Sequence, residues 1–117
     1  MKKALIILVL FLGFGLVNCK NGGASSIETK VHVWGNCEKC KATIEKSCNM
    51  NGVSFCSWDV DSKLLSLKLD TSIVSMDAVL QSVSKAGYDN EKYYANDYAY
   101  DNLPTCCQYE RRPFESK

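Results

Sequence analysis

The sequence predicts a small α+β domain in which one antiparallel sheet is covered on one face by two helices. Two observations predict it. Short segments in which apolar residues alternate, as in half-buried strands, are interleaved with two segments whose apolar residues recur at helical spacing. Their order is strand, helix, strand, strand, helix and a further strand. This βαββαβ order is typical of a ferredoxin-like sandwich.

Each element is predicted from its own pattern and its own breaks. The strands are expected over residues 28–34, 53–60, 64–69 and, with a more polar and aromatic composition, 88–94. The helices are expected over residues 38–48 and from residue 71 or 72 to 86. The apolar positions are Thr29, Val31 and Val33 in the first strand, Cys40, Ile44 and Cys48 in the first helix, Leu65, Leu67 and Leu69 in the third strand, and Ile73, Met76, Val79, Leu80 and Val83 in the second helix. Ser75 is a candidate cap for the second helix, because a serine hydroxyl accepts from free N–H groups at a helix start.

The first 18 residues are predicted to be a signal peptide. Residues 4–17 form an almost unbroken apolar run, shorter than the roughly 20 residues that span a bilayer. The run ends in the letters LVNC, which resemble the lipobox of bacterial lipoproteins, although Asn18 stands where that motif usually has a small residue. The resemblance implies a lipid on Cys19 and a place in the bacterial cell envelope, anchored to the membrane and facing the periplasm. The alternative is an ordinary secreted protein in which Cys19 is incidental.

The rest of the chain is expected to hold one domain between two extensions. Residues 19–27 are rich in Gly and Ser and are predicted to be a lipidated tether. The domain itself is predicted over residues 28–94. Residues 95–117 are predicted to be a C-terminal extension that carries the adjacent pair Cys106 and Cys107.

Charge excludes one class of partner. Without its signal peptide the chain has 12 basic and 13 acidic residues, and it contains no basic run. Nucleic-acid binding depends on clustered Lys and Arg that neutralise phosphates. The chain is therefore expected not to bind nucleic acid, and it is expected to be a monomer.

A Cys-x-x-Cys pair at a strand-to-helix junction is the chemical centre of the sequence. Gly35 and Asn36 break the first strand, and Cys37 and Cys40 follow at the start of the first helix. Such a pair either holds a soft metal ion or exchanges a disulfide. Thioredoxin-type exchangers need a cis-proline beside the thiols, and the first proline of this chain is Pro104. Metal binding is therefore favoured over redox catalysis.

The domain resembles the heavy-metal-associated family, which includes copper chaperones, modules of copper-transporting ATPases and periplasmic mercury-binding proteins. The segments that carry the resemblance are Cys37-Glu38-Lys39-Cys40, Ile44-Glu45-Lys46, Gly52-Val53 and Lys85-Ala86-Gly87-Tyr88. The family usually has Gly-Met-x-Cys-x-x-Cys, with the Met packed beneath the loop. Here Gly35-Asn36-Cys37 is one residue shorter and lacks the Met.

The resemblance implies a non-enzymatic protein that binds and transfers a soft ion. Cys37 and Cys40 would be the ligands and Tyr88 a neighbour. Cu(I) is the expected ion, with Ag(I) and Hg(II) as alternatives, because soft ions prefer thiolates. Zn(II) is disfavoured, since structural zinc normally takes four ligands. The expected partner is a metal transporter or an efflux component; the alternatives are a mercury transport system, thiol–disulfide exchange, or an adaptor that docks a partner without metal.

Four further cysteines leave alternatives open. Cys48 and Cys56 are both expected to face the core, either as buried thiols or as a disulfide. Cys106 and Cys107 could complete the metal site, bind a second ion, serve as an exposed transfer point, or lie in a disordered tail.

Overall fold

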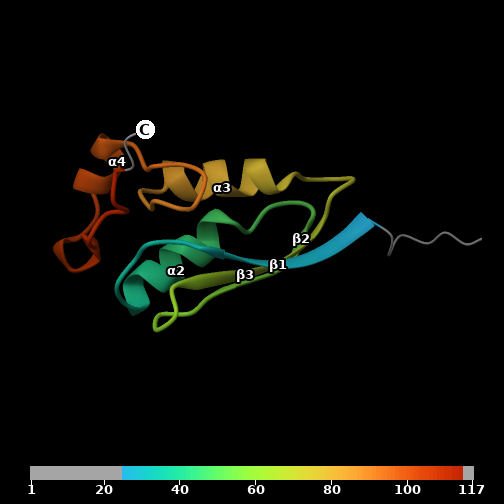
Figure 1. The fold of residues 1–117 in the computed structure, drawn as a ribbon, viewed down its shortest axis with the longest axis horizontal. Coiled ribbons are helices and arrows are strands. Elements are labelled where there is room, and N and C mark those ends of the chain that lie inside the picture. The colour runs from blue at the N-terminus through green and yellow to red at the C-terminus, as the bar shows by residue number, and fades with distance from the viewer. Residues whose placement is uncertain (1–24, 115–117) are drawn as a thin grey trace, which may run out of the picture.

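The computed structural model describes residues 25–114 (Figure 1). The predicted signal peptide, the predicted lipidation site Cys19 and most of the predicted tether lie outside the described residues. Among residues 25–114, no helix has both the length and the apolar character needed to traverse a bilayer.

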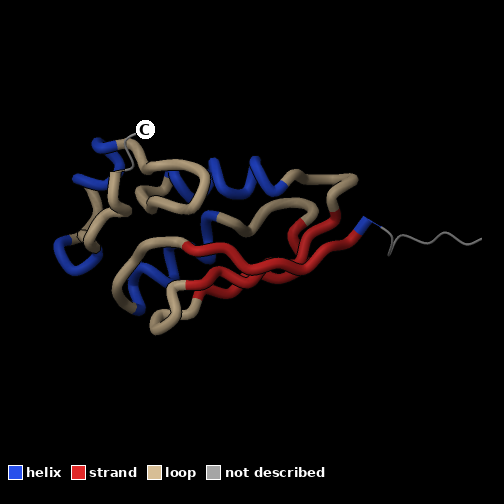
Figure 2. The backbone as a smooth tube through the Cα atoms, in the orientation of Figure 1, coloured by secondary structure: helices blue, strands red, loops and turns tan. Residues whose placement is uncertain are grey.

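Three strands and two longer helices form the domain, and shorter helical turns follow. The elements are β1 (Ser26–His32), α2 (Glu38–Ser47), β2 (Val53–Trp58), β3 (Leu64–Asp70), α3 (Met76–Lys85), α4 (Asp97–Asp101) and the 3₁₀ turn η2 (Thr105–Cys107). The strands pair antiparallel in the order β1-β3-β2. Figure 2 shows them as one layer, and Figure 1 shows α4 and the C-terminal segment at the end of the sheet where β1 leads into α2. The predicted α+β class is confirmed.

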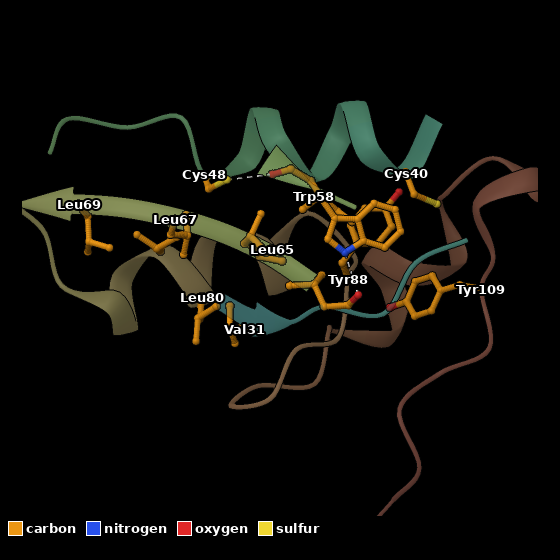
Figure 3. Close-up of a cluster of buried hydrophobic side chains, with 14 of the residues drawn as sticks. Val31, Cys40, Cys48, Trp58, Leu65, Leu67, Leu69, Leu80, Tyr88 and Tyr109 are labelled. Carbon is orange, nitrogen blue, oxygen red and sulfur yellow. Dashed lines mark hydrogen bonds between the residues drawn. The ribbon is translucent and has the colours of Figure 1, made fainter. Parts of the chain in front are cut away.

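One face of the sheet forms the core. Leu65, Leu67 and Leu69 of β3 are at most 2% exposed, which confirms their predicted alternation. Val31 of β1 and Trp58 of β2 are both paired with Leu65, so the three strands present apolar side chains to the same side. Figure 3 shows these side chains in one cluster with those of the helices. Burial of such aliphatic side chains stabilises a fold by about 1.5–3 kcal/mol each.

The predicted fourth strand, residues 88–94, is reduced to a single bridge between Val33 and Asn90. The reason is that the side chain of Asn90 pairs with nearby backbone N–H groups. The Oδ1 atom of Asn90 accepts hydrogen bonds of 3.0 Å from the N–H groups of Lys92 and Tyr93, which turns the chain away from the sheet. Asparagine offers the backbone this alternative to a strand ladder. The bridge still lies beside the end of β1, where a fourth strand of this fold would pair.

The second helix begins later than predicted, at Met76. Ser75 is its cap, as expected, and its Oγ accepts a 3.0 Å hydrogen bond from the N–H of Ala78. Ile73 was expected on the apolar stripe but precedes the helix and is 54% exposed. Asp70 explains the delay, because its backbone carbonyl accepts from the N–H of Ile73 and holds the preceding residues in a turn.

Cys48 and Cys56 form a disulfide, which decides between the two alternatives left open by the sequence. The bridge joins the end of α2 to β2, and the two Cα atoms are 6.7 Å apart. It closes a short loop, since the cysteines are 8 residues apart in sequence. Closing a loop of this length is expected to stabilise the fold by about 2.5 kcal/mol, because the disulfide reduces the conformational entropy of the unfolded chain. The helix that begins at Cys-x-x-Cys is thereby tied covalently to the sheet.

Candidate metal site

The loop that carries the two thiols rests on Trp58. This side chain is fully buried, and its indole N–H donates a 2.9 Å hydrogen bond to the carbonyl of Val33. A Cβ atom on Gly35 would lie 3.0 Å from two carbons of the indole ring, so the loop can approach this closely only with glycine. Trp58 therefore packs beneath the loop.

Cys37 lies immediately before the first residue of α2 and is partly exposed. The backbone N–H of Cys40 lowers the pKa of the Cys37 thiol, and that of Lys39 adds to the effect, against the opposing influence of burial. Free N–H groups at a helix start stabilise a thiolate in this way. Cys37 therefore forms the reactive, metal-binding species more readily than an ordinary cysteine.

Cys40 lies in the first turn of α2 and is fully buried. Its Sγ is 3.9 Å from the Sγ of Cys37. The same sulfur donates a 3.0 Å hydrogen bond to the side-chain oxygen of Asn36 and accepts one of 3.4 Å from the N–H of that residue. Asn36 thus orients the buried thiol, so the shortened loop still directs both sulfurs to one point.

The C-terminal extension brings a third thiol to this pair. The Sγ atoms of Cys37, Cys40 and Cys107 all lie within 4.8 Å of one another. Cys107 is 1% exposed, and burial, followed by the neighbouring Cys40, raises its pKa to about 12. Cys106 is exposed and lies outside this cluster, although its Sγ is 4.0 Å from that of Cys107. Of the two tail cysteines, only Cys107 joins the predicted pair.

A buried ion pair holds the extension in place. The carboxylate of Asp89 has no exposed surface and accepts two hydrogen bonds from the guanidinium of Arg111, at 2.8 and 2.9 Å. It also accepts from the backbone N–H groups of Ala95, at 2.7 Å, and Arg112, at 2.9 Å. Burial opposes ionisation of Asp89, but these donors outweigh it and hold the pKa of the carboxyl below its usual range.

Tyr109 holds the part of the C-terminal extension that lies nearer to the thiols. Its hydroxyl donates a 2.7 Å hydrogen bond to the carbonyl of Gly87 and accepts one of 2.9 Å from the N–H of Asp89. Its ring stacks on that of Tyr88, with centroids 5.4 Å apart, and Tyr100 donates a 2.6 Å hydrogen bond to its backbone carbonyl. Figure 3 shows Tyr109 next to Tyr88, at the end of the core that holds Cys40.

Tyr88, which the resemblance implies to be a neighbour of the metal ligands, lies in the same buried cluster as Cys40 and Cys107. Its ring is fully buried and its hydroxyl has no hydrogen-bond partner among the described residues. Burial raises the pKa of Tyr88, and the neighbouring Cys40 and Cys107 raise it further, so the hydroxyl keeps its proton. An O–H donor without an acceptor among the described residues therefore lies in the same buried cluster as Cys40 and Cys107.

Several residues that shape the site were not predicted as site residues from the sequence: Asn36, Trp58, Asp89, Tyr109 and Arg111. Most of them act through contacts between distant segments, which leave no local pattern. One signal was available. The two arginines of the chain are adjacent, at positions 111 and 112, and follow the cysteine pair closely. Arginine paired with a buried carboxylate is a common way to fasten a segment.

These features define a class of small α+β domain with a cluster of thiols at one end of its sheet. The family model of the heavy-metal-associated domain matches residues 36–89, which supports the resemblance drawn from the motifs. The matched segment contains Cys37, Cys40 and Tyr88, whereas Cys107 lies beyond it.

Solved structures share the fold. A protein of Bacillus anthracis str. Ames that is named for copper-ion binding is 24% identical, with a TM-score of 0.54; the alignment covers 56% of this chain and 96% of that one. The CopZ metallochaperone is also 24% identical, with a TM-score of 0.53, over 55% of this chain and 98% of that one. No curated protein sequence matches the chain. At this identity the structural likeness shows the fold alone.

Proposed function

We propose that this domain binds one soft metal ion and passes it to a partner protein, and that it acts by binding rather than by catalysis. The observation that carries the proposal is the pair of thiols of Cys37 and Cys40, 3.9 Å apart at the start of α2, inside the segment that matches the heavy-metal-associated domain. Soft ions favour thiolate over oxygen ligands.

Cu(I) is the ion proposed first. The names of the two fold neighbours point to copper, and a pair of thiolates suits an ion of low coordination number. Ag(I) and Hg(II) would be held by the same sulfurs. The second candidate function is therefore Hg(II) binding in a mercury transport system. Zn(II) fits less well, because a closed zinc site takes four ligands.

Transfer is proposed because the ion would sit at the end of the domain beside an accessible thiol. Cys37 is only partly buried, so a thiolate of a partner protein could approach an ion on that side. The N–H groups at the start of α2 also stabilise the Cys37 thiolate when it leaves the ion. A metal transporter or an efflux component is the proposed partner.

Exchange of both cysteines for serine tests the binding proposal. The full chain, purified reduced and without oxygen, is expected to bind one Cu(I) in competition with a chromophoric chelator, and Cys37→Ser with Cys40→Ser is expected to abolish stoichiometric binding. The matched control is Cys106→Ser, which removes an exposed thiol outside the cluster and should bind as wild type does. Undiminished binding by the double variant would overturn the proposal, whereas turnover of a model disulfide by the wild type would favour thiol–disulfide exchange.

The cellular location is proposed from the N-terminal motif and the disulfide. A disulfide such as Cys48–Cys56 persists in an oxidising compartment, which is where an exported protein is expected. We infer that the chain is a monomer held at the cell envelope by a lipid on Cys19, facing the periplasm. Mass spectrometry of protein extracted from bacterial membranes is expected to find the lipid on an N-terminal Cys19. Cys19→Ala should release the protein into the soluble fraction; retention of that variant in the membrane would contradict the anchor.

A further inference from the structure

We propose that Cys107 is a third ligand, so that the ion is held by three thiolates and the C-terminal extension is part of the metal site. The inference rests on the proposed function, because it concerns the same ion as Cys37 and Cys40. It goes beyond the family match, which ends at residue 89.

The spacing of the sulfurs fits a three-ligand site. With metal–sulfur bonds of about 2.3 Å, as in zinc sites, three sulfurs placed evenly around an ion are about 4 Å apart, and two on opposite sides are about 4.6 Å apart. Cys37 and Cys40 are 3.9 Å apart, and all three sulfurs lie within 4.8 Å of one another. The third thiol therefore already stands near the position that a trigonal site requires.

The extension is held in this position by contacts that do not involve an ion. The Asp89–Arg111 ion pair and the hydrogen bond from Tyr109 to Gly87 fix the chain two and four residues beyond Cys107. A preorganised ligand costs little further ordering when the ion arrives. The third thiol is thus presented by a fastened segment and not by a free tail.

Tyr88 provides an independent observation. Its buried hydroxyl has no hydrogen-bond partner among residues 25–114, and its side chain lies in the same buried cluster as those of Cys40 and Cys107. Buried hydroxyl groups are normally satisfied. Metal-bound thiolates carry negative charge and accept hydrogen bonds, so loading both sulfurs would give this donor an acceptor.

The ligand count of the Cu(I)-loaded full chain tests the proposal. X-ray absorption on monomeric, reduced protein is expected to find three sulfur ligands in the wild type and in Cys106→Ser, and two in Cys107→Ser. Competition with a chelator should show an affinity lower by about tenfold or more in Cys107→Ser. Sedimentation of each loaded sample ensures that no sulfur comes from a second copy.

A second variant tests the role of the fastening. Arg111→Gln leaves every cysteine in place but weakens the hold on Asp89, and it is expected to lower both the sulfur count and the affinity. Two sulfurs in the wild type, or an unchanged affinity in Cys107→Ser, would overturn the third ligand. Loss of binding in Cys37→Ser with Cys40→Ser would at the same time leave the proposed function standing, so the two failures are distinguishable.

Discussion

Trp58→Ala is expected to lower the free energy of unfolding by about 3–5 kcal/mol, the range found when a large buried aromatic side chain is truncated in a core. Trp58 is fully buried, pairs with Leu65 in the sheet and supports the loop at Gly35. Its removal leaves a cavity beneath the loop and an unpaired carbonyl on Val33. Since small domains are stable by only about 5–15 kcal/mol, the loss is a large fraction of the total.

Urea denaturation followed by circular dichroism measures this effect. Trp58→Phe is the matched control: it retains a ring but loses the indole N–H, so we expect a smaller cost of about 1–3 kcal/mol, from the unpaired carbonyl. The alanine variant should also bind Cu(I) more weakly, because the loop loses its support. An unfolding free energy of the alanine variant within about 1 kcal/mol of wild type would contradict the role assigned to Trp58.

Asp89→Asn is expected to cost about 3 kcal/mol of stability, the lower end of the range for breaking a buried ion pair, because Arg111 is 28% exposed at its side chain. Asparagine keeps the shape but leaves the guanidinium without its buried charge partner. Asp97→Asn is the matched control. Asp97 contacts the same arginine at 3.3 Å but is 92% exposed, and its loss should cost no more than about 1 kcal/mol.

The same pair predicts a dependence on pH. The pKa of Asp89 is lower in the folded state than its unfolded value of about 3.9, so its contribution to stability is complete above that pH. The contribution is lost as the pH falls through the folded pKa, when the carboxyl takes up a proton. Wild type should therefore lose stability below about pH 4 more steeply than Asp89→Asn. Parallel acid titrations of unfolding, with equal slopes for the two proteins, would refute this.

The secondary structure followed closely from local pattern. The alternation of Leu65, Leu67 and Leu69 predicts β3 and its buried face, and the hydrogen bond from Ala78 to Ser75 confirms the predicted cap. Such signals are local because they depend on the spacing of side chains along one element. The prediction of a fourth strand was wrong, because the side chain of Asn90 accepts from backbone N–H groups that strand pairing would have used.

In the candidate site, too, some features were predictable from the sequence and others required the tertiary structure. Cys37 and Cys40 were predicted as ligands because their spacing and their place before a helix are visible in the sequence; that they bind metal stays a prediction. The place of Tyr88 beside the thiols came from the family resemblance. The choice between free thiols and a disulfide at Cys48 and Cys56 needed the distance between α2 and β2.

The sequence by itself therefore determined the order of the elements, the apolar face of the sheet and the Cys-x-x-Cys pair at a helix start. Only the tertiary structure decided that the pair has a third thiol beside it. Cys107 lies 67 residues beyond Cys40, and it reaches the site because Asp89 and Arg111, themselves 22 residues apart, form a buried ion pair. Contacts between distant residues form only when the chain folds and closes the long loops between them, so the local spacing of residues in the sequence does not predict them.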